Sequence, residues 1–215
     1  MEFLTLIQQL RKQTEKRNFD QTFDLIINLK DFDVRKESLN TSLELPVIPE
    51  KKKICAFLEN PSSNVDHVIT KADVEKLDLK QVKALGNQYD FFIASAKLMP
   101  TIAAKFGKVL GVMGKMPDPK IGSVIMQETE DNIKRTVEKL SKTLKIKAKE
   151  PSVKLAIGKE SMKDEDLAKN ASAVYDVIIN SLSKREANVR SIMLKFTMGK
   201  PVKIKPGQAN IVKDK

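Results

Sequence analysis

The sequence predicts a mixed fold, in which a split two-layer α+β domain built from both ends of the chain carries an inserted Rossmann-like α/β domain. Two observations predict it. Residues 1–49 and 142–215 combine strands of period two with amphipathic helices, whereas residues 50–141 alternate short apolar strands with helical segments. We therefore expect one discontinuous domain over 1–49 and 142–215, and one inserted domain over 50–141.

The first part of the chain predicts a helix and two strands. Apolar residues recur at helical spacing over residues 3–10, so we expect an amphipathic helix there. Apolar and polar side chains mostly alternate over residues 23–29, which indicates a strand with one buried face. A short strand over 43–45 ends at Pro46. Residues 46–53 hold two prolines and end in three lysines, which is typical of a connection between domains.

The middle of the chain alternates strands and helices. Apolar runs at 54–58 and 91–95 predict buried strands, and helical patterns occupy about 72–86 and 97–106. A further helix over about 129–144 begins with acidic residues, which the positive end of a helix dipole favours. This order of elements favours a parallel sheet covered by helices.

The last part returns to strands of period two. Alternation over 144–148 and the apolar run 153–157 predict two strands. A capping box at residues 161–164 predicts the start of a long helix, whose apolar stripe runs over 167–182. A final strand is expected over 192–197. These elements complement those of residues 1–49.

Positive charge is concentrated in one part of the chain. The net charge is +11 in 215 residues, and residues 142–215, with 17 basic and 8 acidic residues, carry +9 of it. Lysines at alternate strand positions are often only a solvated face. Their concentration in one third of the chain favours a binding site for a polyanion such as a nucleic acid.

The chain lacks the patterns of secretion and membrane insertion. No run of 18 apolar residues occurs, and the first ten residues do not have the basic-then-apolar pattern of a signal peptide. We expect a soluble, cytoplasmic protein. The chain has no Trp and few aromatic residues, so recognition of an RNA by its shape and backbone is favoured over stacking on single-stranded bases.

No residue pattern predicts catalysis, and we expect neither a metal nor a cofactor. Cys55 lies in a buried strand, and the single His67 has no second ligand nearby for zinc. The alternative is an enzyme that binds a nucleotide in the inserted domain through the glycines of residues 107–116. A phosphate-binding loop would need Gly at Val109 and Ser or Thr at Met116, and the dinucleotide-binding glycine spacing is also absent.

The chain contains three motifs whose order and spacing can be compared with those of known families. They are Lys16-Arg17-Asn18-Phe19-Asp20-Gln21-Thr22, the stretch 107–120, and Thr197-Met198-Gly199-Lys200-Pro201. With them, the chain resembles the L-one family of large-subunit ribosomal proteins in its archaeal-like form, over residues 15–206. The resemblance implies a split RNA-binding domain with an inserted Rossmann-like domain, and no enzymatic activity.

The resemblance also implies the RNA-binding residues. In such proteins a strand with a Phe-x-x-Thr element and a Thr-Met-Gly turn hold the RNA. Here these are Phe19, Thr22, Thr197, Met198 and Gly199. Nearby basic residues are expected to contact phosphates, namely Arg35, Lys36, Lys154, Lys195 and Lys200.

One departure from the family pattern concerns the inserted domain. Where the family has Gly-Pro-Arg-Gly and Pro-Asn-Pro-Lys, this chain has Gly-Val-Met-Gly at 111–114 and Pro-Asp-Pro-Lys at 117–120. An arginine is lost and an aspartate gained, which weakens the case for an RNA or tRNA contact through this stretch.

The resemblance implies the partners and the role. It implies large-subunit ribosomal RNA at the mobile stalk near the exit site, assistance in releasing deacylated exit-site tRNA, and repression of translation by binding its own messenger RNA. It also implies a monomer when free, located on the large ribosomal subunit in the cytoplasm.

Overall fold

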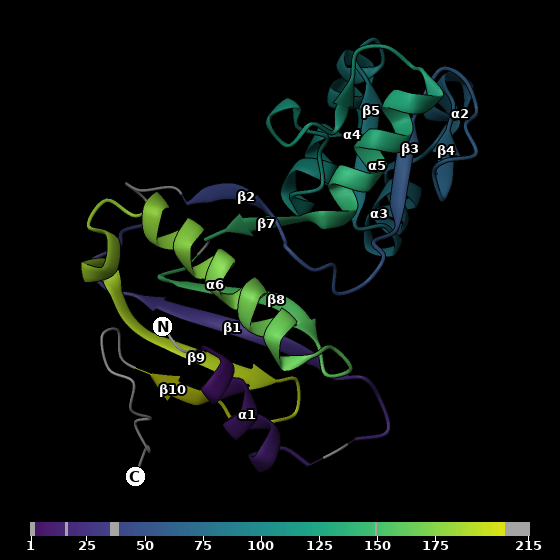
Figure 1. Ribbon diagram of the computed structural model, residues 1–215. Coiled ribbons are helices and arrows are strands. Elements are labelled where there is room, and N and C mark those ends of the chain that lie inside the picture. The colour runs from purple at the N-terminus through teal and green to yellow at the C-terminus, as the bar shows by residue number, and fades with distance from the viewer. Residues whose placement is uncertain (1–2, 16, 35–38, 149, 205–215) are drawn as a thin grey trace. The chain divides into compact units, whose positions relative to one another are not determined.

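The computed structural model of the protein describes residues 3–15, 17–34, 39–148 and 150–204, and these form two compact units (Figure 1). One unit combines residues from 1–50 and 142–215, and the other comprises residues 51–141. Unit 1 has antiparallel sheets with two long helices, and unit 2 has a parallel sheet with helices. The predicted mixed fold class is confirmed.

A four-stranded antiparallel sheet organises unit 1, in the order β10-β9-β1-β8. Its strands are β10 (Val202–Ile204), β9 (Val189–Phe196), β1 (Thr22–Leu29) and β8 (Ser152–Lys159). Strand β1 pairs with β8 on one side and with β9 on the other. The first half of the chain therefore supplies a central strand to a sheet whose other strands come from the second half. Strand β10, only three residues long, was not predicted.

Two helices, α1 (Phe3–Gln13) and α6 (Asp164–Ser181), pack against each other over one face of this sheet (Figure 1). Burial alternates along β1, so that Phe23, Leu25, Ile27 and Leu29 point into the core. The rings of Phe23 and Phe196 meet edge to face, with centroids 5.0 Å apart. This packing fixes the strand register, because a slip of one residue would turn the apolar set outward.

A two-stranded ribbon lies where the chain leaves unit 1 and returns to it. Strand β2 (Asn40–Glu44) pairs antiparallel with β7 (Thr143–Lys147). Just beyond the ladder, the Leu45 N–H donates to the Lys142 carbonyl at 2.9 Å. The two ends of the chain segment that forms unit 2 are therefore held side by side. Strand β2 begins earlier than the predicted strand at 43–45.

The predicted capping box at the start of α6 is wrong. The helix begins at Asp164 and its N-cap is Lys163, without a side-chain capping bond. Ser161 instead donates from its hydroxyl to Asp20 Oδ2 at 2.8 Å and from its N–H to Asp20 Oδ1 at 3.0 Å. These bonds hold Ser161 against Asp20, two residues before the N-cap, so its hydroxyl oxygen does not accept from the first N–H groups of the helix. The first turn of the helix is acidic, with Asp164, Glu165 and Asp166 at the positive end of the helix dipole.

A parallel sheet in the order β4-β3-β5-β6 forms the centre of unit 2. Its strands are β3 (Ile54–Phe57), β4 (His67–Ile69), β5 (Phe91–Ser95) and β6 (Val124–Ile125). The short strands β4 and β6 were not predicted, since they have too few residues to display a period. All four residues of β3 are buried, as expected for a strand covered on both faces.

The helices of unit 2 differ from the sequence prediction in their bounds. The single helix predicted over 72–86 is two helices, α2 (Lys71–Lys76) and α3 (Leu79–Gln88), because Asp78 caps α3 and interrupts the run. The helix predicted over 97–106 continues as α4 (Met99–Met113) to a left-handed Gly114 with φ of 70°. Helix α5 (Glu130–Lys142) and the short 3-10 helix η1 (Pro119–Ile121) complete the unit. Within the described residues, no helix combines the length and the apolar character that crossing a membrane requires.

Burial of Cys55 in β3 gives a testable consequence. Desolvation raises the pKa of this thiol from 9.0 to about 12. The folded protein therefore disfavours the reactive thiolate. We expect Cys55 to stay unmodified by a chromogenic disulfide reagent at pH 8 and to react promptly in denaturant.

The same shift has a sign for stability. Above pH 9 the unfolded chain loses the thiol proton while the folded chain keeps it, so stability should fall as pH rises towards about 12. Replacement of Cys55 by Ala removes the titrating group and serves as the control. In the reactivity test, equal rates of modification of Cys55 in the folded and the unfolded protein at pH 8 would contradict its burial in β3.

Candidate nucleic-acid interface

The start of β1 and the end of β9 lie side by side, because the two strands are antiparallel neighbours. The Thr-Met-Gly turn (residues 197–199) follows β9 and is tied to β1 by three hydrogen bonds. The Thr22 N–H donates to Thr197 Oγ1 at 3.1 Å, and the Thr197 N–H donates to the Thr22 carbonyl at 3.1 Å. The Thr197 hydroxyl also donates to that carbonyl at 3.3 Å. The structure thus brings together two motifs that are 175 residues apart.

These bonds change the interpretation of Thr197. The family resemblance implies that Thr197 helps to hold the RNA, but the proton of its hydroxyl is already engaged with the Thr22 carbonyl. A threonine hydroxyl has one donor and two acceptor sites. In this arrangement it holds the turn, and what remains for a ligand is acceptor capacity.

Two large apolar side chains are exposed at this end of unit 1. Met198 is 63% exposed and Phe19 is 51% exposed. Single exposed apolar residues are common in proteins. Met198 belongs to the turn, and Phe19 lies just before the start of β1. Both lie among polar groups, which suits them to pack against the sugars and bases of a nucleic acid.

The turn also packs tightly on the end of α1. A Cβ atom added at Gly199 would lie 3.3 Å from Thr14 Oγ1, so a larger residue there would push against the helix end. A pocket of about 350 Å³ lies between this helix end and the turn. Arg17 and Lys200 contribute cations to its lining, Glu15 contributes a carboxylate that pairs with Arg17 at 3.3 Å, and Gln21 also borders it.

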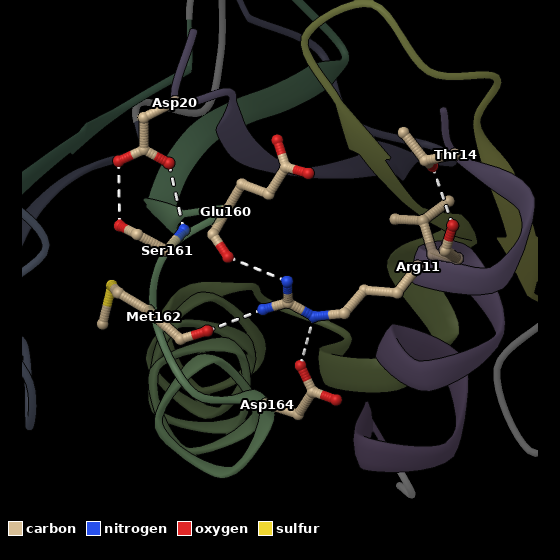
Figure 2. Close-up of polar contacts among 8 residues, drawn as sticks. Arg11, Thr14, Asp20, Glu160, Ser161, Met162 and Asp164 are labelled. Atoms are coloured by element: carbon tan, nitrogen blue, oxygen red, sulfur yellow. Dashed lines mark hydrogen bonds and ion pairs between the residues drawn. The ribbon is translucent and has the colours of Figure 1, made fainter. Parts of the chain in front are cut away.

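A polar cluster around Arg11 ties α1 to the segment that joins β8 to α6 (Figure 2). Arg11 of α1 donates to the carbonyls of Glu160 at 2.8 Å and Met162 at 2.6 Å, and its Nε donates to Asp164. The guanidinium also lies over the Phe196 ring, 5.9 Å from its centroid. Planar guanidinium groups suit such sets of directed bonds. Sequence reasoning missed Arg11, because its neighbours Lys12, Lys16 and Arg17 share its charge and give no sign of which one is structural.

The predicted phosphate-binding lysines lie in different places. Lys200 is exposed directly after the turn. Lys195 faces Asp24 across the β1–β9 pairing, and Lys154 faces Ile26 across β1–β8, so both lie on the sheet face opposite the helices. Lys154 also forms an ion pair with Glu150 at 3.1 Å.

Charge on that sheet face is mixed. Partial burial raises the pKa of Asp24, while the neighbouring Lys195 lowers it. The carboxyl group is thus partly desolvated on the same face as the two lysines. Arg35 and Lys36 lie outside the described residues.

The glycine-bearing stretch of unit 2 is not a phosphate-binding loop. Gly107 and Gly111 lie within α4, and Gly114 ends it. Phosphates bind where a helix begins, at the positive end of its dipole, and this stretch leads to the negative end. The Asp118 carboxylate, which departs from the family pattern, accepts from the Lys120 N–H at 2.9 Å at the start of η1.

The parallel sheet has its topological switch point between β3 and β5, where related folds bind anionic ligands. A carboxylate of the chain itself occupies the backbone donors there. Glu128 accepts from the Glu59 N–H at 3.0 Å and from the Asn60 N–H at 3.3 Å. Lys97 donates to the Glu59 carboxylate at 2.9 Å, and this hydrogen bond raises the pKa of Lys97. These donors are therefore satisfied without a nucleotide. Among the described residues, no three His, Cys, Asp or Glu side chains gather as metal ligands would.

Comparison with known proteins places these motifs in a family. Residues 10–200 match the ribosomal protein L1p/L10e family. The chain is 38% identical over 210 residues to the large ribosomal subunit protein uL1 of Thermococcus kodakarensis, covering 92% of this chain and 94% of that protein. It is 35% identical over 209 residues to the protein of the same name from Nanoarchaeum equitans, covering 92% and 98%. The relative from Methanobrevibacter smithii is 33% identical, with 94% and 98% covered.

Removing the Arg11 side chain should destabilise unit 1. Replacement of Arg11 by Met leaves two carbonyls and a carboxylate without their donor, which should cost on the order of 2 kcal/mol. Urea unfolding, followed by tyrosine fluorescence in a Tyr89→Phe background, would measure this loss of stability. Tyr175 is then the remaining tyrosine, and it lies in unit 1.

Lys12→Met is the matched control, since it removes the same charge from an exposed site on the same helix. It should change stability by less than about 0.5 kcal/mol. Equal losses for the two variants would show that net charge, rather than the directed bonds of Arg11, is responsible.

Proposed function

Because the chain belongs to the ribosomal protein L1p/L10e family, we propose that it binds large-subunit ribosomal RNA through the Thr-Met-Gly turn and the start of β1. The family consists of ribosomal proteins, which are structural rather than enzymatic, and its relatives are named as proteins of the large subunit. The protein is accordingly a structural component of the large ribosomal subunit.

One observation carries the RNA-binding proposal, namely that the two family motifs meet at one end of the sheet. Phe19 and Met198 are exposed there beside the hydrogen-bonded pair Thr22 and Thr197. Exposed apolar groups set in a polar, fixed backbone suit the shallow surface of an RNA helix or loop, where shape and 2′-hydroxyl groups are recognised. Gly199 lets the turn pack closely on the end of α1, because a Cβ atom there would lie 3.3 Å from Thr14 Oγ1.

Positive charge supports the same site. Residues 1–49 and 142–215 together carry +8 of the net +11. Lys195 and Lys200 lie on either side of the turn in sequence, and Arg17 lines the pocket next to it. Phosphate contacts of this kind supply affinity and position the RNA, while the turn and the strand start supply the fit.

On the family resemblance, we propose that the RNA is the stalk region near the exit site and that the protein assists release of deacylated tRNA. A similar RNA fold in its own messenger RNA would bind the same surface and repress translation. Both roles use the one RNA-binding face of unit 1 and predict a monomer when free.

Replacement of Met198 by Glu tests the RNA-binding site. The change places a carboxylate on an exposed turn that faces phosphates, so affinity for a stalk RNA fragment should fall by at least about tenfold. The thermal midpoint should stay nearly unchanged, because the side chain is 63% exposed. Met126→Glu is the matched control, since Met126 is 80% exposed and lies in unit 2.

Titrations at several salt concentrations separate the two kinds of contact. Log affinity falls as log salt rises, and Lys200→Gln should make this negative slope shallower by about 0.9 if the lysine neutralises one phosphate. Loss of RNA binding in Met126→Glu to the same degree as in Met198→Glu would contradict the proposed site.

A shortened chain tests the division between the units. Residues 1–49 joined to 142–215 by a short Gly-Ser linker should fold and bind the RNA, because Leu45 and Lys142 are already hydrogen-bonded at 2.9 Å. Closing so short a loop should cost on the order of 1–3 kcal/mol. Circular dichroism and RNA titration would measure both outcomes. If residues 50–141 alone bind the stalk RNA as tightly as the whole chain, the RNA-binding site lies in unit 2 instead.

A further inference from the structure

Gln21 is a buried amide directly beneath the Thr-Met-Gly turn. Its side chain is fully buried, with an exposed fraction of 0%. Its Oε1 accepts from the Met198 N–H at 3.2 Å, and its Nε2 donates to Glu160 Oε2 at 3.1 Å. An N–H needs an acceptor and a carboxylate needs a donor, so only one orientation of the amide satisfies both neighbours.

The anchor of this amide is itself held in place. The Glu160 N–H donates to the Gln21 carbonyl at 2.8 Å, which joins the two residues a second time. The Glu160 carbonyl accepts from Arg11 at 2.8 Å, and the next residue, Ser161, is bonded to Asp20. Glu160 therefore offers a fixed acceptor to the amide on one side of the bridge.

The other side of the bridge completes the turn. Within the turn, the Thr197 N–H donates to Thr22 and the Gly199 N–H donates to Phe196 at 2.9 Å. The bond to Gln21 gives the Met198 N–H its partner. The orientation of the Met198 peptide, and with it the direction of the exposed side chain, depends on the side chain of Gln21, the residue just before β1.

We propose that Gln21 is a positioning residue, which sets RNA affinity by bridging Glu160 to the Met198 peptide without touching the RNA. This inference rests on the proposed function of the turn. Gln21 occupies a variable position of the Phe-x-x-Thr element, so the motif itself does not assign it a role. A binding surface whose shape is fixed before the RNA arrives avoids the loss of conformational entropy that a loose turn would incur on binding.

Three substitutions in the full chain test the bridge. Gln21→Met keeps a similar volume and removes both bonds, and it should weaken binding of the stalk RNA fragment about tenfold, the equivalent of one or two hydrogen bonds. Gln21→Glu sets two carboxylates against each other and should weaken it at least as much. Glu160→Gln is the control, because the new amide still offers an oxygen to Gln21 and affinity should be kept.

The double variant Gln21→Glu with Glu160→Gln reverses the polarity of the bond and keeps the overall charge. It should restore affinity to within about threefold of the original chain, a larger gain than additive effects would allow. If the double variant binds as poorly as Gln21→Glu alone, the bridge does not act on affinity and the inference is overturned.

Hydrogen exchange without RNA gives a second readout. The Met198 amide should exchange faster in Gln21→Met than in the original chain, while amides in the middle of β1 keep their protection. Unchanged exchange at Met198, or unchanged RNA affinity of a folded Gln21→Met, overturns the inference. Failure of the original chain to bind the stalk fragment would instead overturn the proposed function.

Discussion

The pairing of β1 with strands from the far end of the chain is the constraint on which the rest of unit 1 depends. Strand β1 lies between β8 and β9, so its backbone groups are satisfied on both sides only after the second half of the chain has joined it. The antiparallel direction then determines which ends meet. The start of β1 lies beside the end of β9, and two motifs 175 residues apart become one surface. Insertion of unit 2 is compatible with this sheet because β2 and β7 hold the two crossings together.

The surface so formed is held by the bonds between Thr22 and Thr197 and by a polar network of buried and partly buried side chains next to it. Arg11, Gln21 and Glu160 are at least partly buried, and each binds a partner from a different part of the chain. Buried polar groups are costly when unpaired, so such a network favours one arrangement of the turn. Met198 and Phe19, in contrast, are left exposed on a fixed backbone. The division is physical: polar bonds determine the shape, and exposed apolar and basic groups provide the contacts.

Strands and helices with enough residues to display a period were predictable from the sequence, as β1 and α1 illustrate. Strand β5 was predictable as a continuous apolar run. The strands β4, β6 and β10 have two or three residues and display none. The capping box at 161–164 failed because Ser161 binds Asp20, a contact across 141 residues that local pattern cannot reveal. Motif resemblance assigned Thr197 and Met198 to the site, and this assignment stays a prediction. It gave no sign of Arg11 or Gln21, whose roles follow from hydrogen bonds between elements distant in sequence.

The central claim is that the Thr-Met-Gly turn is held rigid in the free protein and that RNA binds there. Backbone amide spectra of the ¹⁵N-labelled protein, recorded with and without the stalk RNA fragment, test it most directly. We expect the amides of Thr22 and Met198 to resist hydrogen exchange before RNA is added, and the largest shift changes on binding to occur at residues 19–22 and 197–200. Rapid exchange of both amides in the free protein, together with shift changes confined to residues 51–141, would contradict it.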